Sequence, residues 1–411
     1  MPFERSVSPA RSGRLVPRLL GFLLGLSLAY AAEAAPSAAQ WIAAHAKPAT
    51  DLAAFGSAIG DHTLVALAED SHGDGAAFAL KERLVEYLHE KKGFDVLFLE
   101  SGLYDVSAIW QAAQGGASVA AQGPGNIFFM YSKSREGSAL LDYVDQQRKT
   151  AHPLILAGID AQHSGGLALN EMPGALIAYL KARGAAAPGE DYLALMHRII
   201  GFDRTPPGAE QQAAFFAAAE KLEGGLCAPQ PDSLHFPDSP GWWCRILRSL
   251  DSQAHDYWQG TGSRDTAMAE NLHWLMDNPY KGHKAMLWAH IGHAARFIRP
   301  DTGSPSMGQV LSGFYGDRYY VATVTAGGGD IIDFTTMKPV PLAPTQPGSL
   351  EEALGRLKPP ALFLDLRGAP DAVTGMAVRS FEYQYFPVTA KMLGLDGVFY
   401  LKTAKPVQMV E

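Results

Sequence analysis

Short apolar runs alternate along the chain with longer stretches in which apolar residues recur every three or four positions. Six runs have the length and composition of buried strands, and each ends in polar or small residues: 63–68, 95–100, 154–158, 285–289, 319–324 and 361–364. After the first run, Ala77, Leu80, Leu84 and Leu88 fall on one face of a helix. This alternation predicts an α/β fold with a mostly parallel central sheet flanked by helices.

The segment between the third and fourth runs follows a different pattern. No strand-like run occurs between Leu167 and His283, and the segment divides into several helical stretches with proline-containing loops at 206–207 and 229–240. We therefore expect a helical insertion subdomain at about 167–283 that covers one side of the sheet. It belongs to one α/β domain spanning 35–411.

The first residues have the pattern of a Sec signal peptide. Four arginines precede an apolar run of about 14 residues, and Ala32-Glu33-Ala34 offers the small residues that signal peptidase requires. The alternative is a membrane anchor, but a spanning helix needs roughly 20 apolar residues. We predict a signal peptide at 1–34, a periplasmic or secreted protein, and no stable membrane anchor after cleavage.

The net charge bears on which partners the chain can bind, and the cysteine content bears on whether it contains a disulfide. The chain has a formal net charge of -8 and contains no lysine and arginine run, which argues against a nucleic acid partner. Cys227 and Cys244 are its two cysteines. An exported chain allows a disulfide between them, and two buried free thiols are the alternative.

Acidic and histidine side chains follow the expected strands. Glu69 and His72 follow the first, Glu100 ends the second, Asp160 and His163 follow the third, His290 and His293 follow the fourth, and Asp365 and Arg367 follow the last. The carboxyl ends of parallel strands meet at one edge of a sheet, where ligands bind. One shared site is the simplest interpretation, and separate salt bridges and helix caps are the alternative.

The residue types of this site suit acid and base chemistry. A histidine held by a neighbouring carboxylate, as His72 would be by Glu69, can take a proton from water near neutral pH. The same glutamates and histidines also form a common ligand set for a divalent metal, so metal-dependent hydrolysis stays open. Ser71 is not in a Gly-x-Ser-x-Gly elbow, which disfavours a serine nucleophile.

At these residues the chain resembles the erythromycin esterase family, whose members include proteins named for succinoglycan biosynthesis. The family's Gly-Glu-x-x-His-Gly motif is similar to Ala68 through Gly73, and its Gly-x-Asp to Gly158 through Asp160. Its Arg-Asp-x-x-Met-x-x-Asn helix matches Arg264 through Asn271, its Trp-Ala-His-x-x-His strand matches Trp288 through His293, and a Met-Gly follows at 307–308. The resemblance covers about residues 64–320.

The resemblance implies a cofactor-independent hydrolase that binds a small-molecule ester or lactone, without a required metal. In it His72 is the general base, Glu69 and Glu100 orient and charge-balance that histidine, and His290 and His293 contact substrate or stabilise the oxyanion. Substrate binding falls to three further side chains, Lys81, Asp160 and Arg264.

Two departures from the family pattern bear on the substrate. The family has a glutamate four residues after the motif histidine and an arginine nine after it, where this chain has Ala76 and Lys81. Lysine keeps the charge but lacks the planar fork of arginine. We therefore expect a natural substrate other than a macrolide. A non-catalytic periplasmic protein that binds a ligand or haem through His72 or His290 is a third possibility.

Overall fold

The computed structural model describes residues 36–228, 233 and 235–410. The expected signal peptide at 1–34 lies outside these residues, and residues 37–411 form one compact unit. Within the described part of the chain, no helix combines the length and apolar character that crossing a membrane requires.

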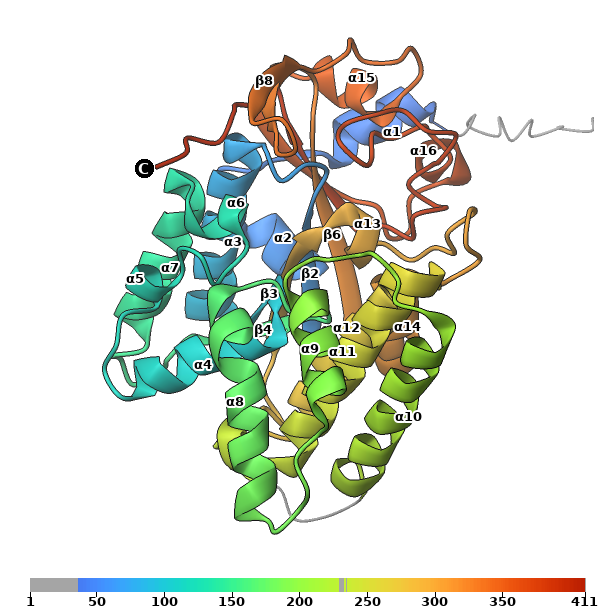
Figure 1. The fold of residues 1–411 in the computed structure, drawn as a ribbon. Helices are drawn as coiled ribbons and strands as arrows, with labels where there is room; N and C mark the ends of the chain where they lie inside the picture. The colour runs from blue at the N-terminus through green and yellow to red at the C-terminus, as the bar shows by residue number, and fades with distance from the viewer. Residues whose placement is uncertain (1–35, 229–232, 234, 411) are drawn as a thin grey trace, which may run out of the picture. The chain divides into compact units, whose positions relative to one another are not determined.

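An eight-stranded sheet lies at the centre of this unit (Figure 1). Its strand order is β1-β9-β10-β6-β2-β5-β3-β4. The six strands from β10 to β4 run parallel, and β9 pairs antiparallel with both β10 and β1. The prediction of an α/β fold with a mostly parallel sheet is confirmed. The sheet strands are β1 (Lys47–Pro48), β2 (Leu64–Glu69), β3 (Val96–Gly102), β4 (Ile155–Asp160), β5 (Ala285–His290), β6 (Tyr319–Ala326), β9 (Ala361–Asp365) and β10 (Gly397–Leu401).

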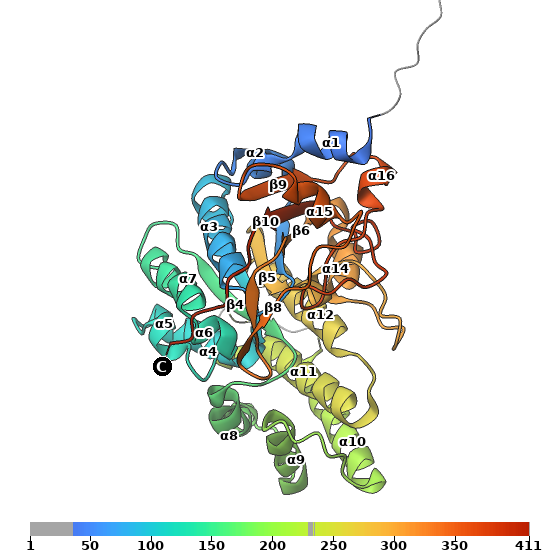
Figure 2. The same cartoon turned by 90° about the horizontal axis from the view of Figure 1, so that it is seen from above.

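Helices cover both faces of the sheet, because alternate side chains of each strand point to opposite faces. In β2, Leu64, Ala66 and Ala68 join one apolar core, whereas Val65 and Leu67 join the other. The two groups of helices flank the strands in Figure 2. On the second face lie α2 (Ala53–Ala58), α3 (Gly75–Lys92), α5 (Val119–Gln122), α6 (Phe129–Ser132) and α7 (Arg135–Gln147), and α4 (Leu103–Gln114) contributes to both cores.

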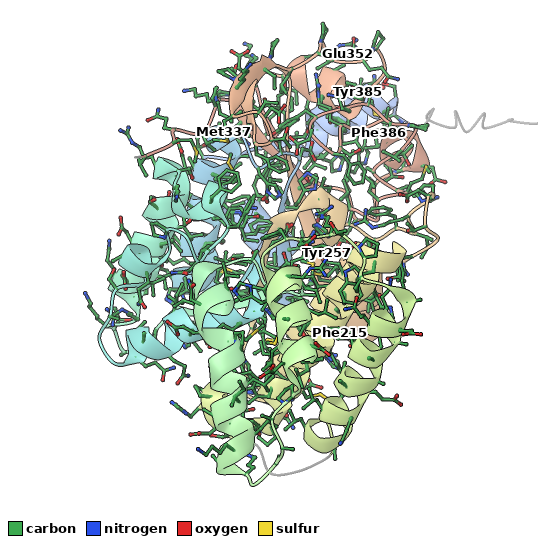
Figure 3. All side chains as sticks on the ribbon, viewed as in Figure 1. Phe215, Tyr257, Met337, Glu352, Tyr385 and Phe386 are labelled. Carbon is green, nitrogen blue, oxygen red and sulfur yellow. A yellow bond between two sulfur atoms is a disulfide. The ribbon has the colours of Figure 1, made fainter. Side chains whose placement is uncertain are left out.

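The segment between β4 and β5 is helical and packs on the first face. It contains α8 (Gly166–Ala182), α9 (Glu190–Ile200), α10 (Ala209–Leu226), η1 (Phe236–Asp238), α11 (Pro240–Gln259) and α12 (Arg264–Asp277). Phe215 and Tyr257, labelled in Figure 3, lie in this segment. Cys227 and Cys244 form a disulfide that ties the end of α10 to α11. The remaining helices are α1 (Ala38–His45), α13 (Ile291–Ala294), α14 (Met307–Tyr315), η2 (Gly316–Arg318), α15 (Leu350–Gly355) and α16 (Asp371–Thr374).

The C-terminal segment returns to the carboxyl ends of the strands. A small hairpin of β7 (Asp330–Asp333) and β8 (Lys338–Pro341) follows β6, and its Ile332 amide donates to the Gly73 carbonyl. Later, the Glu382 amide donates to the Asp70 carbonyl at 2.6 Å. Both contacts reach the loop that follows β2, so two distant parts of the chain meet beside His72.

Candidate active site

The polar residues that follow the central strands line one pocket. Because β2 and β5 are parallel neighbours, Glu69 pairs in register with His290 at their carboxyl ends. The register between β3 and β4 shifts after Leu99, which places Glu100 at an irregular end of β3. A pocket of about 570 Å³ opens there. Of the predicted site residues, its walls include His72, Glu100, Asp160, Arg264, His290 and His293.

Glu69 orients His72. The Nδ1 atom of His72 lies 3.1 Å from Glu69 Oε1, and Glu69 Oε1 also accepts a hydrogen bond of 2.9 Å from the Tyr131 hydroxyl. A carboxylate at Nδ1 favours the tautomer with the proton on Nδ1, which leaves the Nε2 lone pair available. No contact among the described residues occupies that Nε2. The side chain of His72 keeps 10% of its surface exposed, toward the pocket.

Lys81 forms a buried ion pair with Glu69. Its side chain is fully buried, its ammonium donates to Glu69 Oε2, and its Nζ lies 3.9 Å from the centre of the Trp288 ring. Burial lowers the pKa of Lys81 to about 8, although the charge of Glu69 opposes that shift. Burial also raises the pKa of Glu69, but Lys81 and His72 outweigh it and hold that pKa below its ordinary value. Lys81 does not line the pocket, so its place differs from the substrate contact expected for it.

Glu100 is the centre of a balanced ionic network. Its Oε1 lies 3.2 Å from His293 Nε2 and 3.4 Å from an Arg264 amino group, and its Oε2 accepts the His290 amide at 2.8 Å. Arg264 binds both oxygens of Asp160, at 2.9 and 2.5 Å. Burial raises the pKa of Glu100, but His293, His72 and Arg264 together hold it well below its ordinary value.

His293 is a cation in this network. Its Nδ1 donates to Asp265 Oδ1 at 2.5 Å, and Asp265 also accepts from Arg299. Burial lowers the pKa of His293, but Glu100 and Asp265 overcome that effect and raise it to about 10. Arg264 Nη1 lies 3.3 Å from His293 Nε2. With both groups protonated, this approach joins two cations that share Glu100 and is not a hydrogen bond.

His290 is held by the backbone at both ring nitrogens. Its Nε2 lies 3.0 Å from the Asp70 carbonyl, to which it donates, and its Nδ1 accepts the Gly292 amide at 3.1 Å. Burial lowers the pKa of His290 to about 4, and a proton on His72 would lower it in the same direction, so the ring of His290 is neutral. Its ring stands 5.1 Å from that of His72, centre to centre. His290 therefore fixes the two loops around His72 and offers the pocket only its carbon edge.

Several site residues were not expected from the sequence. Asp265 stands next to Arg264 in the quoted motif and Arg299 follows His293 by six residues, which were usable signals, whereas Tyr131 and Glu382 lie in none of the quoted motifs. Phe128 and Phe334 pack against the His72 ring at 4.9 and 5.4 Å between ring centres. They come from a loop and from the segment after β7, which only the folded chain brings together. Asp365 and Arg367 pair with each other and do not line the pocket.

The same side chains include the nitrogen and oxygen atoms that could bind a metal ion. Among the described residues, no group of three or more histidine, cysteine, aspartate or glutamate side chains has the arrangement of a metal site. The nitrogens of His290 and His293 are engaged by protein groups, which leaves the Nε2 of His72 as the histidine donor that faces the pocket.

Comparison with known proteins gives one consistent family. Residues 242–392 match the family model described as erythromycin esterase, a span that includes Arg264, His290, His293 and Glu382. The putative hydrolase YbfO of Bacillus subtilis (strain 168) is 25% identical, and the alignment covers 97% of this chain and all of that protein.

Solved structures share the fold over nearly the whole chain. A Bacillus cereus protein superposes with a TM-score of 0.69 at 20% identity, covering 91% of this chain and 98% of its own. A succinoglycan biosynthesis protein superposes with a TM-score of 0.70 at 17% identity, covering 90% of this chain and 97% of its own. A mutant of the erythromycin esterase EreC in its open conformation gives 0.64 at 16% identity, with 88% and 96% covered. The family match and the shared fold bear out the resemblance to the erythromycin esterase family that the ordered motifs indicated.

Proposed function

We propose that this chain is an exported hydrolase in which His72 activates water to attack a carboxylic ester or lactone. The observation that carries the proposal is the pairing of His72 Nδ1 with a buried, ionised Glu69, which leaves Nε2 free at the pocket. The match to the erythromycin esterase family model over residues 242–392 and the hydrolase name of the Bacillus subtilis relative support hydrolysis. The buried, balanced charges on either side of the ring support a preorganised site.

The reaction follows from these positions. His72 Nε2 removes a proton from a bound water, and the oxygen of that water attacks the carbonyl carbon. Glu69 stabilises the imidazolium that forms, as a carboxylate at Nδ1 does in hydrolytic triads. The same imidazolium then protonates the departing alkoxide oxygen, so the proton returns and the products are an acid and an alcohol.

The developing oxyanion needs a cation or donor at the pocket wall. Both ring nitrogens of His290 are bound to backbone groups, and His293 faces two carboxylates. Arg264 keeps 25% of its side chain exposed and lines the pocket, while Asp160 holds its guanidinium in place. We therefore assign oxyanion stabilisation to Arg264, with His290 and His293 as positioning residues.

The decisive experiment is hydrolysis of a panel of esters, lactones and macrolides by the purified protein, with and without a chelator. His72→Ala should lower turnover by about 100-fold or more, the range for loss of a general base. His152→Ala, an exposed histidine remote from the pocket, is the matched control and should keep full activity. Full turnover in His72→Ala would refute the general-base role, and activity lost on chelation would favour metal-dependent hydrolysis instead.

Export and the choice of substrate complete the proposal. The arginine-rich apolar N-terminus supports a signal peptide, and the Cys227–Cys244 disulfide suits an oxidising compartment. Cell fractionation and the mass of the mature N-terminus test this assignment. The replacement of family residues at Ala76 and Lys81 supports a substrate other than a macrolide, and the ester panel tests that part.

A further inference from the structure

Glu382 is a carboxylate at the pocket wall that the proposed reaction does not use. It lies in the C-terminal segment, beyond every predicted residue that lines the pocket, and keeps 38% of its side chain exposed. Its carboxylate accepts a hydrogen bond from the side chain of Ser71, and its Oε1 lies 3.6 Å from His290 Nε2. Because that nitrogen already donates to Asp70, His290 stays neutral and leaves the charge of Glu382 uncompensated.

Apart from Lys133, the other charges of the site are already balanced. Glu69 is paired with Lys81. The carboxylates of Glu100, Asp160 and Asp265 are matched by the cations of Arg264, His293 and Arg299. Among the described residues, no lysine or arginine lies within ion-pair distance of Glu382. Lys133 also lines the pocket, but no ion pair joins it to Glu382 or to another described residue. Glu382 is therefore available to a charge that the substrate brings.

The chain holds Glu382 in place through an unusual backbone. Phe381, Glu382 and Tyr383 have φ angles of 47°, 61° and 58°, a left-handed conformation that residues other than glycine rarely adopt. This turn lies between α16 and β10, and Tyr385 and Phe386, labelled in Figure 3, follow it in the chain. Buried Arg379 braces the turn by donating to the Tyr383 carbonyl at 2.8 Å.

Two hydrogen bonds fasten this turn to the His72 loop. The Glu382 amide donates to the Asp70 carbonyl at 2.6 Å, and the Tyr383 hydroxyl donates to Asp74 Oδ2 at 2.5 Å. Asp70 and Asp74 flank His72 in the sequence. The backbone that carries Glu382 is thus fixed relative to the proposed base, which limits where its carboxylate can reach.

The remaining walls suit an organic cation. Aromatic rings attract alkylammonium groups through their faces, and a carboxylate beside them completes a common recognition site for such groups. Four phenylalanines line the pocket together with Glu382: Phe128, Phe129, Phe202 and Phe334. The polar groups that face this carboxylate, Ser71 and His290, are neutral.

From this arrangement we infer that Glu382 and the phenylalanine walls bind a cationic amine of the substrate, so that the enzyme acts on esters or lactones that carry an alkylammonium group. This substrate class rests on the proposed hydrolase function. Glu382 would act on specificity, while His72 and Arg264 would carry the chemistry.

The test compares two esters of equal shape and different charge, butyrylcholine and its carbon isostere 3,3-dimethylbutyl butyrate. The wild type should prefer butyrylcholine in kcat/KM by about tenfold or more, as expected for a charge-assisted contact backed by aromatic faces. Glu382→Gln, which keeps size and an oxygen for Ser71, should remove most of that preference while changing turnover of the isostere less than about threefold. Glu382→Asp keeps the charge and should retain part of the preference.

The matched control is Asp333→Asn. Asp333 is a carboxylate that raises the pKa of Glu382 through its charge, but it does not line the pocket and instead caps its own turn at Thr335. The control should leave the preference unchanged. If Asp333→Asn and Glu382→Gln lost the preference for butyrylcholine equally, the preference would come from the general negative charge of the region and not from contact with Glu382. That result would overturn the inference. If Glu382→Gln lowered kcat/KM equally for both esters, Glu382 would support the catalytic role of His72 and not bind the cation. That result would also overturn the inference.

A binding measurement separates this inference from the proposed function. Choline and tetramethylammonium are titrated calorimetrically into the wild type and Glu382→Gln, both checked for the same melting temperature. Binding that Glu382→Gln weakens about tenfold supports the cation site, even for a protein that hydrolyses neither ester and so fails the proposed function. If the wild type bound neither choline nor tetramethylammonium, the cation site would be overturned. If it hydrolysed both esters at equal rates, the cation site would be overturned but the proposed hydrolase function would stand.

Discussion

Lys81 is a fully buried cation whose partner is the carboxylate that orients the proposed base. Lys81→Met keeps the length and apolar stem of the side chain but removes the cation that holds buried Glu69 in its ionised form. Breaking a buried ion pair by removing one partner costs about 3–5 kcal/mol. We expect a loss of that order in urea unfolding, together with reduced turnover because Glu69 no longer stays ionised beside His72. Unchanged stability and turnover would show that Lys81 does not support Glu69.

At this scale, the sequence predicted the residues that stand in ordered motifs and follow strands. His72, Glu100 and Arg264 were predicted and line the pocket. Lys81 was expected at the substrate, whereas helix α3 points it inward beneath Glu69, a direction that spacing from His72 does not determine. Glu382 had no signal in the sequence. Its place depends on a left-handed turn whose Glu382 amide is bound to the Asp70 carbonyl, more than three hundred residues away in the sequence.

Helix α10 is joined to the rest of the fold by packing on α9 and α11 and by the Cys227–Cys244 disulfide. Cys227→Ser with Cys244→Ala removes the crosslink, which closes a loop with a sequence separation of 17 residues. A loop of this length corresponds to about 3 kcal/mol of stabilisation in the chain-entropy model. We expect a lower melting temperature and unchanged ester hydrolysis, because neither cysteine lines the active-site pocket.

Reduction gives an independent check on that element. Dithiothreitol should lower the melting temperature of the wild type toward that of the double variant and leave the variant unaffected. If the double variant had the same melting temperature as the wild type, packing alone would hold α10 in place.

The strands were predictable where the apolar pattern of a short stretch of sequence was enough to identify them. All six expected strands are present, and each begins or ends within two residues of its run. Strands β1, β7, β8 and β10 were not expected. Two of them, β1 and β8, contain proline and have exposed residues, and such edge strands carry little apolar pattern. Strand β10 is apolar and buried, but its run follows a long irregular segment without helical periodicity, so the alternation that identified the other strands was missing.

For the whole molecule, the ionic network makes stability depend on pH through His293. Its folded pKa is raised to about 10 from an ordinary value of 6.5, so it binds a proton in the folded state that the unfolded state releases above pH 6.5. This contribution is fully present below pH 6.5 and is lost as pH rises through 10. Glu82, with a pKa of about 7, contributes with the same sign mainly below pH 7. Lys81, with a pKa of about 8, acts with the opposite sign between 8 and 10.5.

The window from pH 7 to 8 therefore reports chiefly on His293. One proton of difference corresponds to about 1.4 kcal/mol per pH unit, so the free energy of unfolding should fall by about 1 kcal/mol across this window. Urea unfolding at both pH values measures the fall. His293→Gln lowers stability at every pH, since Glu100 and Asp265 lose a cation, but its dependence between pH 7 and 8 should be flatter than that of the wild type. Buried Asp70, whose pKa burial raises well above its ordinary value, shares the sign and is present in both proteins. Parallel slopes in the two proteins would assign the dependence to Asp70 and remove His293 as the cation that balances Glu100.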